Sequence, residues 1–543
     1  FGILGGAILP IYDTFSQYPQ IRRIPVRHEQ AAAHAADAYA RVTHRVGVCV
    51  ATSGPGATNL VTGIANAYMD SSPMVAITAQ VGRSFIGKDA FQETDITGIT
   101  LPITKHNYFV SDTTELAKTV KEAFYIANTG RPGPVLIDIP KDVQQEEVEF
   151  VYPESVDLAG YRTASRGHAV QIKKATQLIN DAERPVVLAG RGVIISQAYD
   201  ELKELAEKAQ IPVVSTLLGI GAFPGDHVLY HGMMGMHGTA CANMAVQSAD
   251  LVVAIGMRFD DRATGNTEGF APHAQIIHID IDPAEIGKNI AVDVPIVGDV
   301  RSVVRAINRE IRRGEHLEWL SQLDKWAREY ASPESKEDHL LLPQYVIRQI
   351  YEATQGDAIV VTGIGQNQMW AAQNFVYTKP NSLISSGGLG TMGFELPGAM
   401  GAKVGRPDEV VWCVAGDGGF QMTMQELATI VQEKLAIKIA IINNGYLGMV
   451  RQWQELFYER RYVDTKLWNP DFVKIAEAYG IPGARVERRE EVVPAIRKAM
   501  DCPEAFLIDF LVEPEENVYP MVAPGESLSR ILHMPKPTAV GSY

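Results

Sequence analysis

The sequence contains no long apolar run and few cysteines, and each absence excludes a class of protein. No stretch reaches the roughly 18 apolar residues that a membrane-spanning helix needs, so we expect no transmembrane segment. Only four cysteines occur among 543 residues, and they form no CxxC pair. This usage predicts neither a disulfide framework nor a zinc cluster, and it favours a cytoplasmic location of the bacterial or archaeal type. Because the chain begins at Phe1 without Met, an organellar location after removal of a transit peptide stays open.

Positive charge is also scarce. The chain has 49 Lys and Arg against 64 Asp and Glu, a net charge of -15. Surfaces that bind nucleic acid or anionic membranes need clustered Lys and Arg, so we expect neither partner. Hydrophobic residues make up 46% and charged residues 21%, which is ordinary for globular domains. A chain of this length exceeds one hydrophobic core, and two to four domains are expected.

Short Val- and Ile-rich runs alternate with amphipathic stretches along most of the chain. Such alternation predicts an α/β fold with mostly parallel sheets flanked by helices. The runs are residues 46–52, 74–79, 134–139, 185–189, 251–255, 275–281, 358–362, 410–415 and 437–443.

Two breaks divide this pattern, an acidic stretch at residues 144–165 and a charged helical stretch at residues 309–339. They predict three domains of ordinary size. A strand, a Gly-rich turn, a helix and a second strand recur near the start and near the end of the chain, which favours first and last domains of one fold. We place the domains at residues 1–150, 165–325 and 340–520, followed by a C-terminal tail at 521–543.

The most informative motif is Gly416-Asp417-Gly418, which follows one apolar strand, together with Asn444, which follows the next. The two glycines permit a tight turn in which backbone N–H groups approach a diphosphate. Asp417 and Asn444 supply the hard oxygen ligands that Mg²⁺ prefers. Taken singly, each motif is more often an ordinary turn after a buried strand.

The pairing of GDG with NN resembles the signature of thiamine-diphosphate enzymes, in which a run of mid-twenties length separates the two. Here 24 residues, 419–442, separate them. The resemblance implies a third metal ligand, the backbone carbonyl of Tyr446. It also implies an activating glutamate that protonates the aminopyrimidine ring of the cofactor, and Glu29 in the RHEQ motif at 27–30 matches it. The alternative for Glu29 is an acid favoured by a helix N-terminus.

Long stretches of the chain resemble the catalytic subunits of acetohydroxyacid (acetolactate) synthases. The resemblance implies an enzyme, a transferase, that decarboxylates pyruvate and joins the product to pyruvate or 2-oxobutanoate in branched-chain amino acid biosynthesis. The alternative is a thiamine- and FAD-dependent pyruvate oxidase. The matching stretches include FGxxGGAILPIYD (1–13), ATSGPGATNLVTGIANAYMDS (51–71), DAFQETDITGIT (89–100), RPGPVLIDIPKDVQ (131–144), RFDDRATGN (258–266), HIDIDPAEIGKN (278–289), SGGLGTMGFELPGAMGAK (386–403) and LGMVRQWQ (447–454).

The resemblance assigns the first and last domains to the pyrimidine and the diphosphate of the cofactor. The substrate channel is implied for Phe91 and Gln92, contributed by a neighbouring subunit, and for Lys141; Gln92 and Lys141 are also catalytic candidates beside Glu29. Trp453 matches the residue that favours 2-oxobutanoate as acceptor, although such a Trp usually only packs. The implied contacts of thiamine diphosphate are Glu29, Gln366, Asn367, Gln368, Gly390, Met392, Gly416, Gly418, Gly419, Asn444 and Met449.

The central domain resembles an FAD-binding domain, and the flavin is implied to be structural, with no net redox role. The acid in HIDID at 278–282 suits ribose recognition at a strand end, although such an acid is often only a helix cap. The implied flavin contacts are Arg131, His237, Arg258, Arg262, Asp280, Ile281 and Asp299.

The resemblance further implies a homodimer or homotetramer with active sites at the subunit interface, and a small regulatory subunit as a further partner. Three positions depart from the family pattern. Ile3-Leu4 replace Tyr and Pro, Asn367 replaces His, and Glu395 replaces Gly. The first two keep the shape and a hydrogen-bond donor, so we expect activity to survive. Glu395 places an additional acid near the cofactor cleft, and the sequence offers no account of it.

Overall fold

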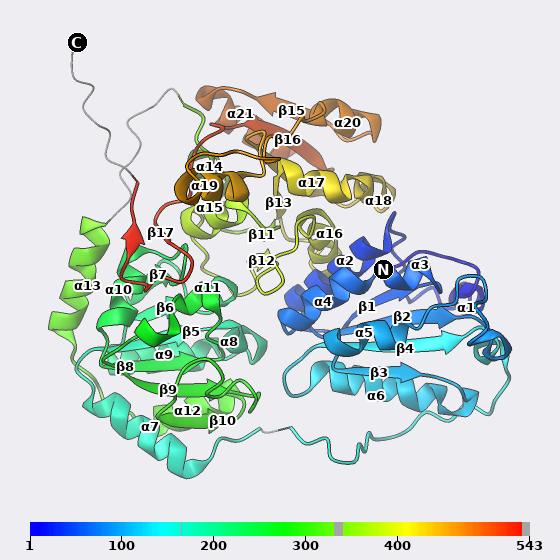
Figure 1. Cartoon of the computed structure of the whole chain (residues 1–543), viewed down its shortest axis with the longest axis horizontal. Coiled ribbons are helices and arrows are strands. Elements are labelled where there is room, and N and C mark those ends of the chain that lie inside the picture. Colours follow the sequence, from blue (N-terminus) through cyan, green and yellow to red (C-terminus); the bar gives the residue numbers. More distant parts are fainter. Residues whose placement is uncertain (164, 331–339, 535–543) are drawn as a thin grey trace. The chain divides into compact units, whose positions relative to one another are not determined.

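The computed structural model describes residues 1–163, 165–330 and 340–534, and these residues form two compact units (Figure 1). The N-terminal and C-terminal regions fold together in the first unit, and the central region forms most of the second. The first unit comprises Phe1–Thr163, His339–Ala371 and Ile384–Glu515. The second unit comprises Ala164–Asp338, Ala372–Leu383 and Glu516–Tyr543.

The N-terminal part of the first unit is a four-stranded parallel sheet in the order β1-β2-β4-β3. Its strands are β1 (Gly47–Ala51), β2 (Met74–Gln80), β3 (His106–Phe109) and β4 (Pro134–Pro140). The helices of this part are α1 (Leu9–Phe15), α2 (Glu29–Thr43), α3 (Pro55–Thr58), α4 (Val61–Met69), α5 (Ile96–Thr100) and α6 (Leu116–Asn128).

The C-terminal part of the first unit is a six-stranded sheet in the order β12-β11-β13-β14-β16-β15. Its strands are β11 (Ile359–Thr362), β12 (Leu383–Ser385), β13 (Val411–Gly416), β14 (Ile437–Asn443), β15 (Gly483–Val486) and β16 (Phe506–Leu511). Its helices are α14 (Pro343–Thr354), α15 (Gln366–Asn374), α16 (Glu395–Gly405), α17 (Asp417–Thr423), α18 (Leu427–Gln432), α19 (Gly448–Phe457), α20 (Phe472–Ala478) and α21 (Val492–Asp501).

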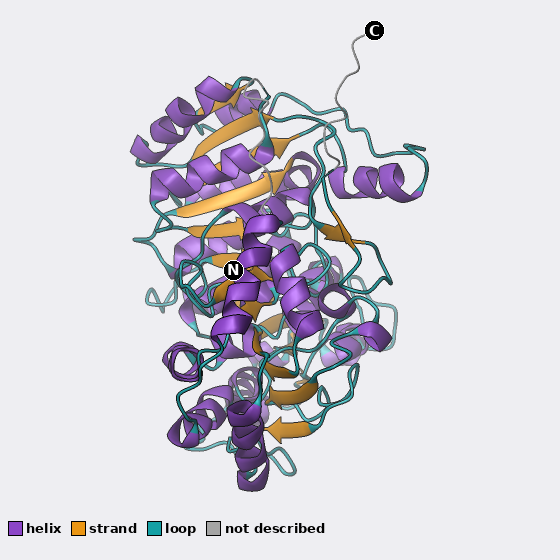
Figure 2. Cartoon of the chain, turned by 90° about the vertical axis from the view of Figure 1, so that its left-hand side faces the viewer, coloured by secondary structure: helices purple, strands orange, loops and turns teal. Residues whose placement is uncertain are grey.

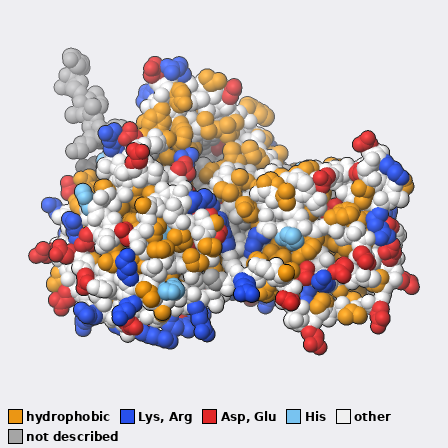
Figure 3. Space-filling view, turned by 60° about the horizontal axis from the view of Figure 1, so that its bottom comes forward, with side chains coloured by type: hydrophobic (Ala, Val, Ile, Leu, Met, Phe, Trp, Pro, Cys, Tyr) orange, Lys and Arg blue, Asp and Glu red, His pale blue; other side chains and the backbone are white. Residues whose placement is uncertain are grey.

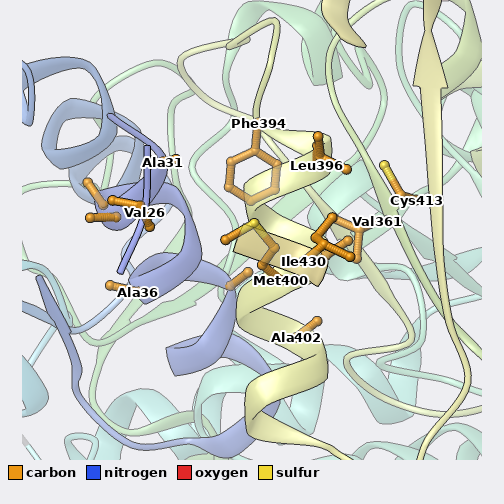
Figure 4. Close-up of a cluster of buried hydrophobic side chains, with 14 of the residues drawn as sticks. Val26, Ala31, Ala36, Val361, Phe394, Leu396, Met400, Ala402, Cys413 and Ile430 are labelled. Atoms are coloured by element: carbon orange, nitrogen blue, oxygen red, sulfur yellow. The ribbon is translucent and has the colours of Figure 1, made fainter. Parts of the chain in front are cut away.

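Helices α2 and α16 join the two parts of the first unit, and Figure 4 shows them side by side with their apolar side chains between them. Small residues permit this close approach, because a Cβ on Gly401 of α16 would overlap the carbonyl of Ala35 in α2. Phe394 and Met400 fill the space beside the alanines of α2, and all of these side chains are buried. The Ala-rich helix behind Glu29 is therefore part of the main hydrophobic core.

The second unit is built on a six-stranded parallel sheet in the order β10-β9-β8-β5-β6-β7, whose strands are labelled in Figure 1. Figure 2 shows strands of the chain lying among helices. Its strands are β5 (Pro185–Ala189), β6 (Val213–Ser215), β7 (Tyr230–Met233), β8 (Leu251–Ile255), β9 (Gln275–Asp280) and β10 (Val294–Val297). Its helices are α7 (Ala169–Asp181), α8 (Arg191–Ile195), α9 (Tyr199–Ala209), α10 (Ala240–Ser248), α11 (Asp261–Thr264), α12 (Val300–Glu310) and α13 (Leu317–Glu329).

The described part of the predicted tail also packs in the second unit. Strands β17 (Met521–Val522) and β18 (Ile531–Leu532) form an antiparallel pair. The backbone N–H of Val522 donates to the carbonyl of Met236 over 2.7 Å, and Val522 and Leu528 are buried in the core of this unit. Residues 535–543 of the tail and residues 331–339 of the second predicted break lie outside the described residues.

The three large sheets confirm the predicted α/β class, with parallel strands between helices. Among the described residues, none of the helices combines the length and the apolar character needed to cross a bilayer. On the face shown in Figure 3, acidic and basic side chains are interspersed.

Candidate functional site

The strand order of the C-terminal sheet reverses between β11 and β13. Strand β12 lies on one side of β11, whereas β13 and β14 lie on the other. Ligands of open parallel sheets bind outside the carboxyl ends of the strands at such a reversal. Here the turn 363–365 follows β11, Asp417 follows β13, and Asn444 follows β14. The fold therefore brings the predicted GDG and NN motifs to neighbouring strand ends.

Asp417 is buried, with 2% of its surface exposed. Its Oδ2 accepts hydrogen bonds from Nδ2 of Asn469 at 2.6 Å and from the backbone N–H of Gly445 at 3.1 Å. Burial raises the pKa of this carboxyl to about 6, and the hydrogen bonds oppose that rise. Within the described part of the chain, no Lys or Arg forms an ion pair with Asp417. The buried carboxylate is thus placed where a cation would stabilise its charge.

Three adjacent polar side chains at the start of α15 are buried beside this turn. Nε2 of Gln366 donates to Oε1 of Gln452 at 2.9 Å, and Oε1 of Gln366 accepts from Nδ2 of Asn444 at 3.0 Å. Nδ2 of Asn367 donates to the carbonyl of Val414 in β13 at 2.9 Å. Asn367 therefore retains the donor that we expected when Asn replaces the family's His.

The next residue, Gln368, does not face Asn444. Its Nε2 donates to Oγ of Ser385, the last residue of β12, at 2.6 Å and to the carbonyl of Ser386 at 2.9 Å. Asn444 also accepts a hydrogen bond at Oδ1 from the backbone N–H of Tyr446 over 3.1 Å. Asp417, Asn444 and Gln366 thus form one cluster, and Gln368 ties this cluster to the following loop.

Glycines shape the space next to the cluster. Gly390 has φ +74, a conformation that favours glycine. A Cβ on Gly418 would lie 2.9 Å from Cδ2 of Leu447 and 3.4 Å from Cε of Met392. Met392 and Gly418 are therefore neighbours, as their predicted roles require.

The structure supplies a physical setting for Glu395. It is the first residue of α16, and 1% of its surface is exposed. A Cβ on Gly363 would overlap its Oε2, and a Cβ on Gly419 would overlap its Oε1, so the carboxyl fills the space that these two glycines leave. Within the described residues Oε2 has no hydrogen-bond partner, and burial raises the pKa of Glu395 to about 7.

Two residues of α19 were predicted to face the site. Met449 lies in its first turn and is half-buried. Trp453, one turn later, is half-buried and meets Phe457 edge-on, with ring centroids 6.2 Å apart. The structure does not test the roles predicted for Met449 and Trp453, which stay predictions.

Glu29 lies at the first position of α2 and is buried. Its Oε2 accepts from Nδ2 of Asn59 at 2.9 Å, and a Cβ on Gly56 would lie 3.4 Å from its Oε1. The same turn after β1 meets Gln92, whose Cα would lie 2.9 Å from a Cβ on Gly54. Gln92 itself has φ +62, which is uncommon for a residue with a side chain. Glu29 and Gln92 therefore face one Gly-rich turn.

Two further predicted channel residues belong to the N-terminal part, and one of them, Phe91, directly precedes Gln92. Phe91 is 88% exposed in the single chain. Lys141 follows β4, and its backbone N–H donates to the carbonyl of Gln80 over 3.0 Å. Among the described residues, no hydrogen bond joins Glu29 to Asp417 or Asn444, so a single chain does not connect these groups directly.

Three residues of this region were not predicted. Glu426, which is buried, accepts the backbone N–H groups of Arg27 and His28 at 3.0 Å each and so fixes the segment before Glu29. Asn469 and Gln452 hold Asp417 and Gln366. No sequence signal marks them, because each lies far from its partner along the chain.

The predicted flavin contacts of the second unit lie at or after the carboxyl ends of several of its strands, and one of them, Asp299, caps a helix. His237 is buried, and burial lowers its pKa to about 4. The carbonyl of Arg262 accepts the backbone N–H of Met236 at 2.8 Å, which places Arg262 beside His237. Asp280, at the end of β9, accepts the backbone N–H of Asp282 at 2.9 Å. Asp299 caps α12 through Ser302 and accepts Oγ of Ser196 at 2.6 Å.

The remaining predicted contacts are Arg258, after β8, Ile281, after β9, and Arg131. Nε of Arg131 donates to Oγ of Ser71 at 2.8 Å, and both residues belong to the first unit. The strand order of the central sheet reverses between β5 and β8, where Gly192 and Gly256 approach so closely that a Cβ on either would lie within 2.5 Å of the other's backbone. The sequence analysis missed the Gly-x-Gly turn at 190–192, although two glycines after an apolar strand are a usable signal.

Comparison with known proteins identifies the family. Models of the thiamine pyrophosphate enzymes match at the N-terminal TPP binding domain (residues 1–99), the central domain (172–307) and the C-terminal TPP binding domain (363–510). The acetolactate synthase large subunit of Corynebacterium glutamicum is 53% identical over 98% of this chain and 87% of its own length. Acetolactate synthase of Mycobacterium bovis is 52% identical over 98% and 88%.

A third relative is the acetolactate synthase large subunit of Cyanidium caldarium, which is 48% identical over 99% of this chain and 94% of its own length. These matches cover all three sheets and confirm the resemblance that the motifs carried. The chain therefore belongs to the acetolactate synthase large-subunit family of the thiamine pyrophosphate (thiamine diphosphate) enzymes.

Proposed function

We propose that this chain is the catalytic subunit of an acetohydroxyacid synthase. It decarboxylates pyruvate and joins the remaining two-carbon unit to a second pyruvate or to 2-oxobutanoate. The products are 2-acetolactate and 2-aceto-2-hydroxybutanoate, at the start of branched-chain amino acid synthesis. One observation carries the proposal: in a chain about half identical to acetolactate synthase large subunits, Asp417 and Asn444 lie at neighbouring strand ends where the sheet order reverses.

The residues present fit thiamine diphosphate with Mg²⁺. Asp417 and Asn444 would hold the metal together with the backbone carbonyl of Tyr446, and these are the oxygen ligands that Mg²⁺ prefers. The fit rests on a buried carboxylate without a basic partner among the described residues, and on the tight turn at Gly418, where a Cβ would lie only 2.9 Å from Cδ2 of Leu447. The remaining cofactor contacts would be Gln366, Asn367, Gln368, Gly390, Met392, Gly416, Gly419 and Met449.

When bound, thiamine diphosphate supplies the carbon nucleophile and the electron sink that decarboxylation of a 2-oxo acid requires. Glu29 would hold the proton at N1′ of the aminopyrimidine ring. Its carboxyl is suited to that task because it is buried and anchored by Asn59 at one oxygen. Gln92 and Lys141 would bind the carboxylate of the 2-oxo acid, with Phe91 and Trp453 as apolar walls.

FAD is proposed as a structural cofactor of the second unit. Gly190, Gly192 and Gly256 make close backbone contacts where the strand order reverses, and this geometry suits a nucleotide diphosphate. His237, Arg262, Arg258, Asp280 and Ile281 would contact the flavin, with Arg131 and Asp299. Asp299 is the weakest of these assignments, because its carboxylate already caps α12 and binds Ser196.

We further propose a homodimer or homotetramer with shared active sites, a small regulatory subunit as partner, and a cytoplasmic location. Exposed Phe91 and the absence of a described hydrogen bond between Glu29 and Asp417 support a site completed by a second chain. The proposed domain limits remain 1–150, 165–325 and 340–520, with the tail at 521–543.

The test is product formation by the purified chain. Acetolactate should form from pyruvate under nitrogen, only with thiamine diphosphate and Mg²⁺, and the protein should be yellow through bound flavin. Pyruvate consumption that requires oxygen and yields no acetolactate would instead identify a pyruvate oxidase. A colourless protein that forms acetolactate would support the synthase function and contradict the proposed flavin.

A further inference from the structure

We propose that Arg41, Asn66 and Asp70 of the N-terminal part are positioning residues for the loop 385–391 of the C-terminal part. That loop carries Gly390 and leads into Met392, so the inference rests on the proposed thiamine-diphosphate site. The three residues act through the loop and touch no reacting atom. The three residues and the loop all belong to the first unit.

The loop is held by hydrogen bonds that come from outside its own sheet. Oδ2 and Oδ1 of Asp70 accept the backbone N–H groups of Gly387 at 3.0 Å and Gly388 at 2.6 Å. Nη1 of Arg41 donates to the carbonyl of Ser385 at 2.6 Å. Three backbone groups, the carbonyl of Ser385 and the N–H groups of Gly387 and Gly388, are thus satisfied by side chains of the N-terminal part, because the chain leaves its strand here.

Asn66 holds the far end of the same loop. Its Oδ1 accepts hydrogen bonds from Oγ of Ser386 at 2.6 Å and from Oγ1 of Thr391 at 3.1 Å. Oγ of Ser386 in turn accepts the backbone N–H of Thr391 at 2.8 Å, which closes the loop on itself. The closed loop contains Gly390 with its positive φ. Asn66 therefore determines the shape of the segment expected beneath the cofactor.

The cluster is itself rigid. Arg41 binds Asp37 through Nε at 2.7 Å and Nη2 at 2.8 Å, and its Nη2 also lies 2.9 Å from Asp70. Nδ2 of Asn66 donates to Oδ2 of Asp37 at 2.7 Å. Although burial disfavours its charge, the carboxylates of Asp37 and Asp70 raise the pKa of Arg41 above its ordinary value. In a buried network whose charged groups are all hydrogen-bonded, each member is restricted to one geometry.

The loop is also held from the cofactor side, by Gln368 through Ser385 and Ser386. Helix α2 carries both the proposed activating residue and a positioning residue, since it begins at Glu29 and Arg41 follows 12 residues later. At 1.5 Å per residue these positions are about 18 Å apart on one rigid element. Apolar packing alone would hold α2 against α16, so the directional polar contacts to the loop point to positioning.

The experiment measures the dissociation constant of thiamine diphosphate, with Mg²⁺, by titration calorimetry on the full-length protein. The variants are Asn66→Ala, Thr391→Val and both together. Each single change should weaken binding about threefold to tenfold, because Thr391→Val removes one buried hydrogen bond of the loop and Asn66→Ala removes two, besides its bond to Asp37. The double variant should bind thiamine diphosphate no more weakly than the single variant with the lower affinity, because both substitutions remove the same hydrogen bond between Thr391 and Asn66. The kcat at saturating cofactor should fall less than the affinity.

Thr354→Val is the matched control. Thr354 and Thr391 are both 8% exposed, and the hydroxyl of Thr354 donates within α14, to the carbonyls of Ile350 at 2.8 Å and Tyr351 at 3.2 Å. Its loss should leave cofactor affinity unchanged. Thr391→Ser, which keeps the hydroxyl, should restore nearly normal affinity and carries the test if Asn66→Ala does not fold.

The positioning role would be overturned if the single variants bound thiamine diphosphate as tightly as Thr354→Val, or if the losses of affinity added in the double variant. In either case the wild-type protein would still bind the cofactor, and the proposed function would stand. Failure of the wild-type protein to bind thiamine diphosphate would overturn the proposed function, and this inference with it.

Discussion

The side-chain amide of Asn469 donates from Nδ2 to Oδ2 of Asp417 over 2.6 Å, and the same nitrogen lies 2.9 Å from Oδ1 of Asn443. Oδ1 of Asn469 accepts from Nε2 of Gln421 at 3.0 Å. Every polar atom of this amide is therefore used, and its orientation leaves the carboxylate of Asp417 only small freedom. A residue 52 positions away in the sequence sets the direction of the proposed metal ligand.

We predict that Asn469→Ala weakens the combined binding of Mg²⁺ and thiamine diphosphate about 10- to 100-fold, the usual effect of removing a group that orients a metal ligand. Calorimetric titration of the variant measures it. Asn308→Ala in the second unit is the control, because Nδ2 of Asn308 also donates to two acceptors, at 2.9 and 3.1 Å. Equal affinities of the two variants would remove Asn469 from the site.

Asp417→Ala should abolish retention of thiamine diphosphate, since it removes the only carboxylate of the proposed metal site. Glu29→Gln should retain the cofactor and lose activity, because the amide cannot hold the proton. Mixing the two inactive proteins should restore part of the activity in hybrid dimers if the site is shared. Absence of recovery, with subunit exchange verified by mass spectrometry, would argue for a site within one chain.

Trp453→Leu should shift the ratio of products toward acetolactate by roughly tenfold, because an apolar wall discriminates one methylene by about 1–3 kcal/mol. Turnover of pyruvate alone should be nearly unchanged. The measurement is the ratio of 2-aceto-2-hydroxybutanoate to 2-acetolactate when both 2-oxo acids compete. Trp326→Leu in α13 is the control, since Trp326 is also half-buried and packs against another indole. An unchanged ratio would leave Trp453 a packing residue.

Glu395 should make stability depend on pH. Burial raises its pKa from 4.5 to about 7, so the folded protein holds a proton that the unfolded chain releases. Its ionisation therefore destabilises the fold progressively as pH rises from about 4.5 to 7, with little further change above. The full effect would be about 3 kcal/mol.

The apparent melting temperatures of wild type and Glu395→Gln, compared at pH 5 and pH 8, measure this effect. The variant should gain on the wild type as pH rises, because contributions from all other groups cancel in the difference. Glu477→Gln, at an exposed position in α20, should follow the wild-type curve. A constant difference between wild type and Glu395→Gln at both pH values would contradict the argument.

Much of the site could be predicted because it depends on local pattern. Apolar runs of strand length predicted the parallel sheets, and residues that follow neighbouring parallel strands meet at one edge. Asp417 and Asn444 therefore had to lie close together once β13 and β14 paired, and the structure pairs them in parallel register. The motifs around them are also specific enough to indicate the family from sequence alone.

Other features appear only in the tertiary structure. Glu426 binds the backbone before Glu29 across 399 positions, and Asp70 holds Gly388 across 318. The sequence does not explain Glu395, whereas the tertiary structure shows that Gly363 and Gly419 leave room for its carboxyl. Periodicity and motifs report on the strand or turn in which a residue lies. Partners of buried polar groups depend on which helices and loops pack together, and that choice is made by the core shared between α2 and α16.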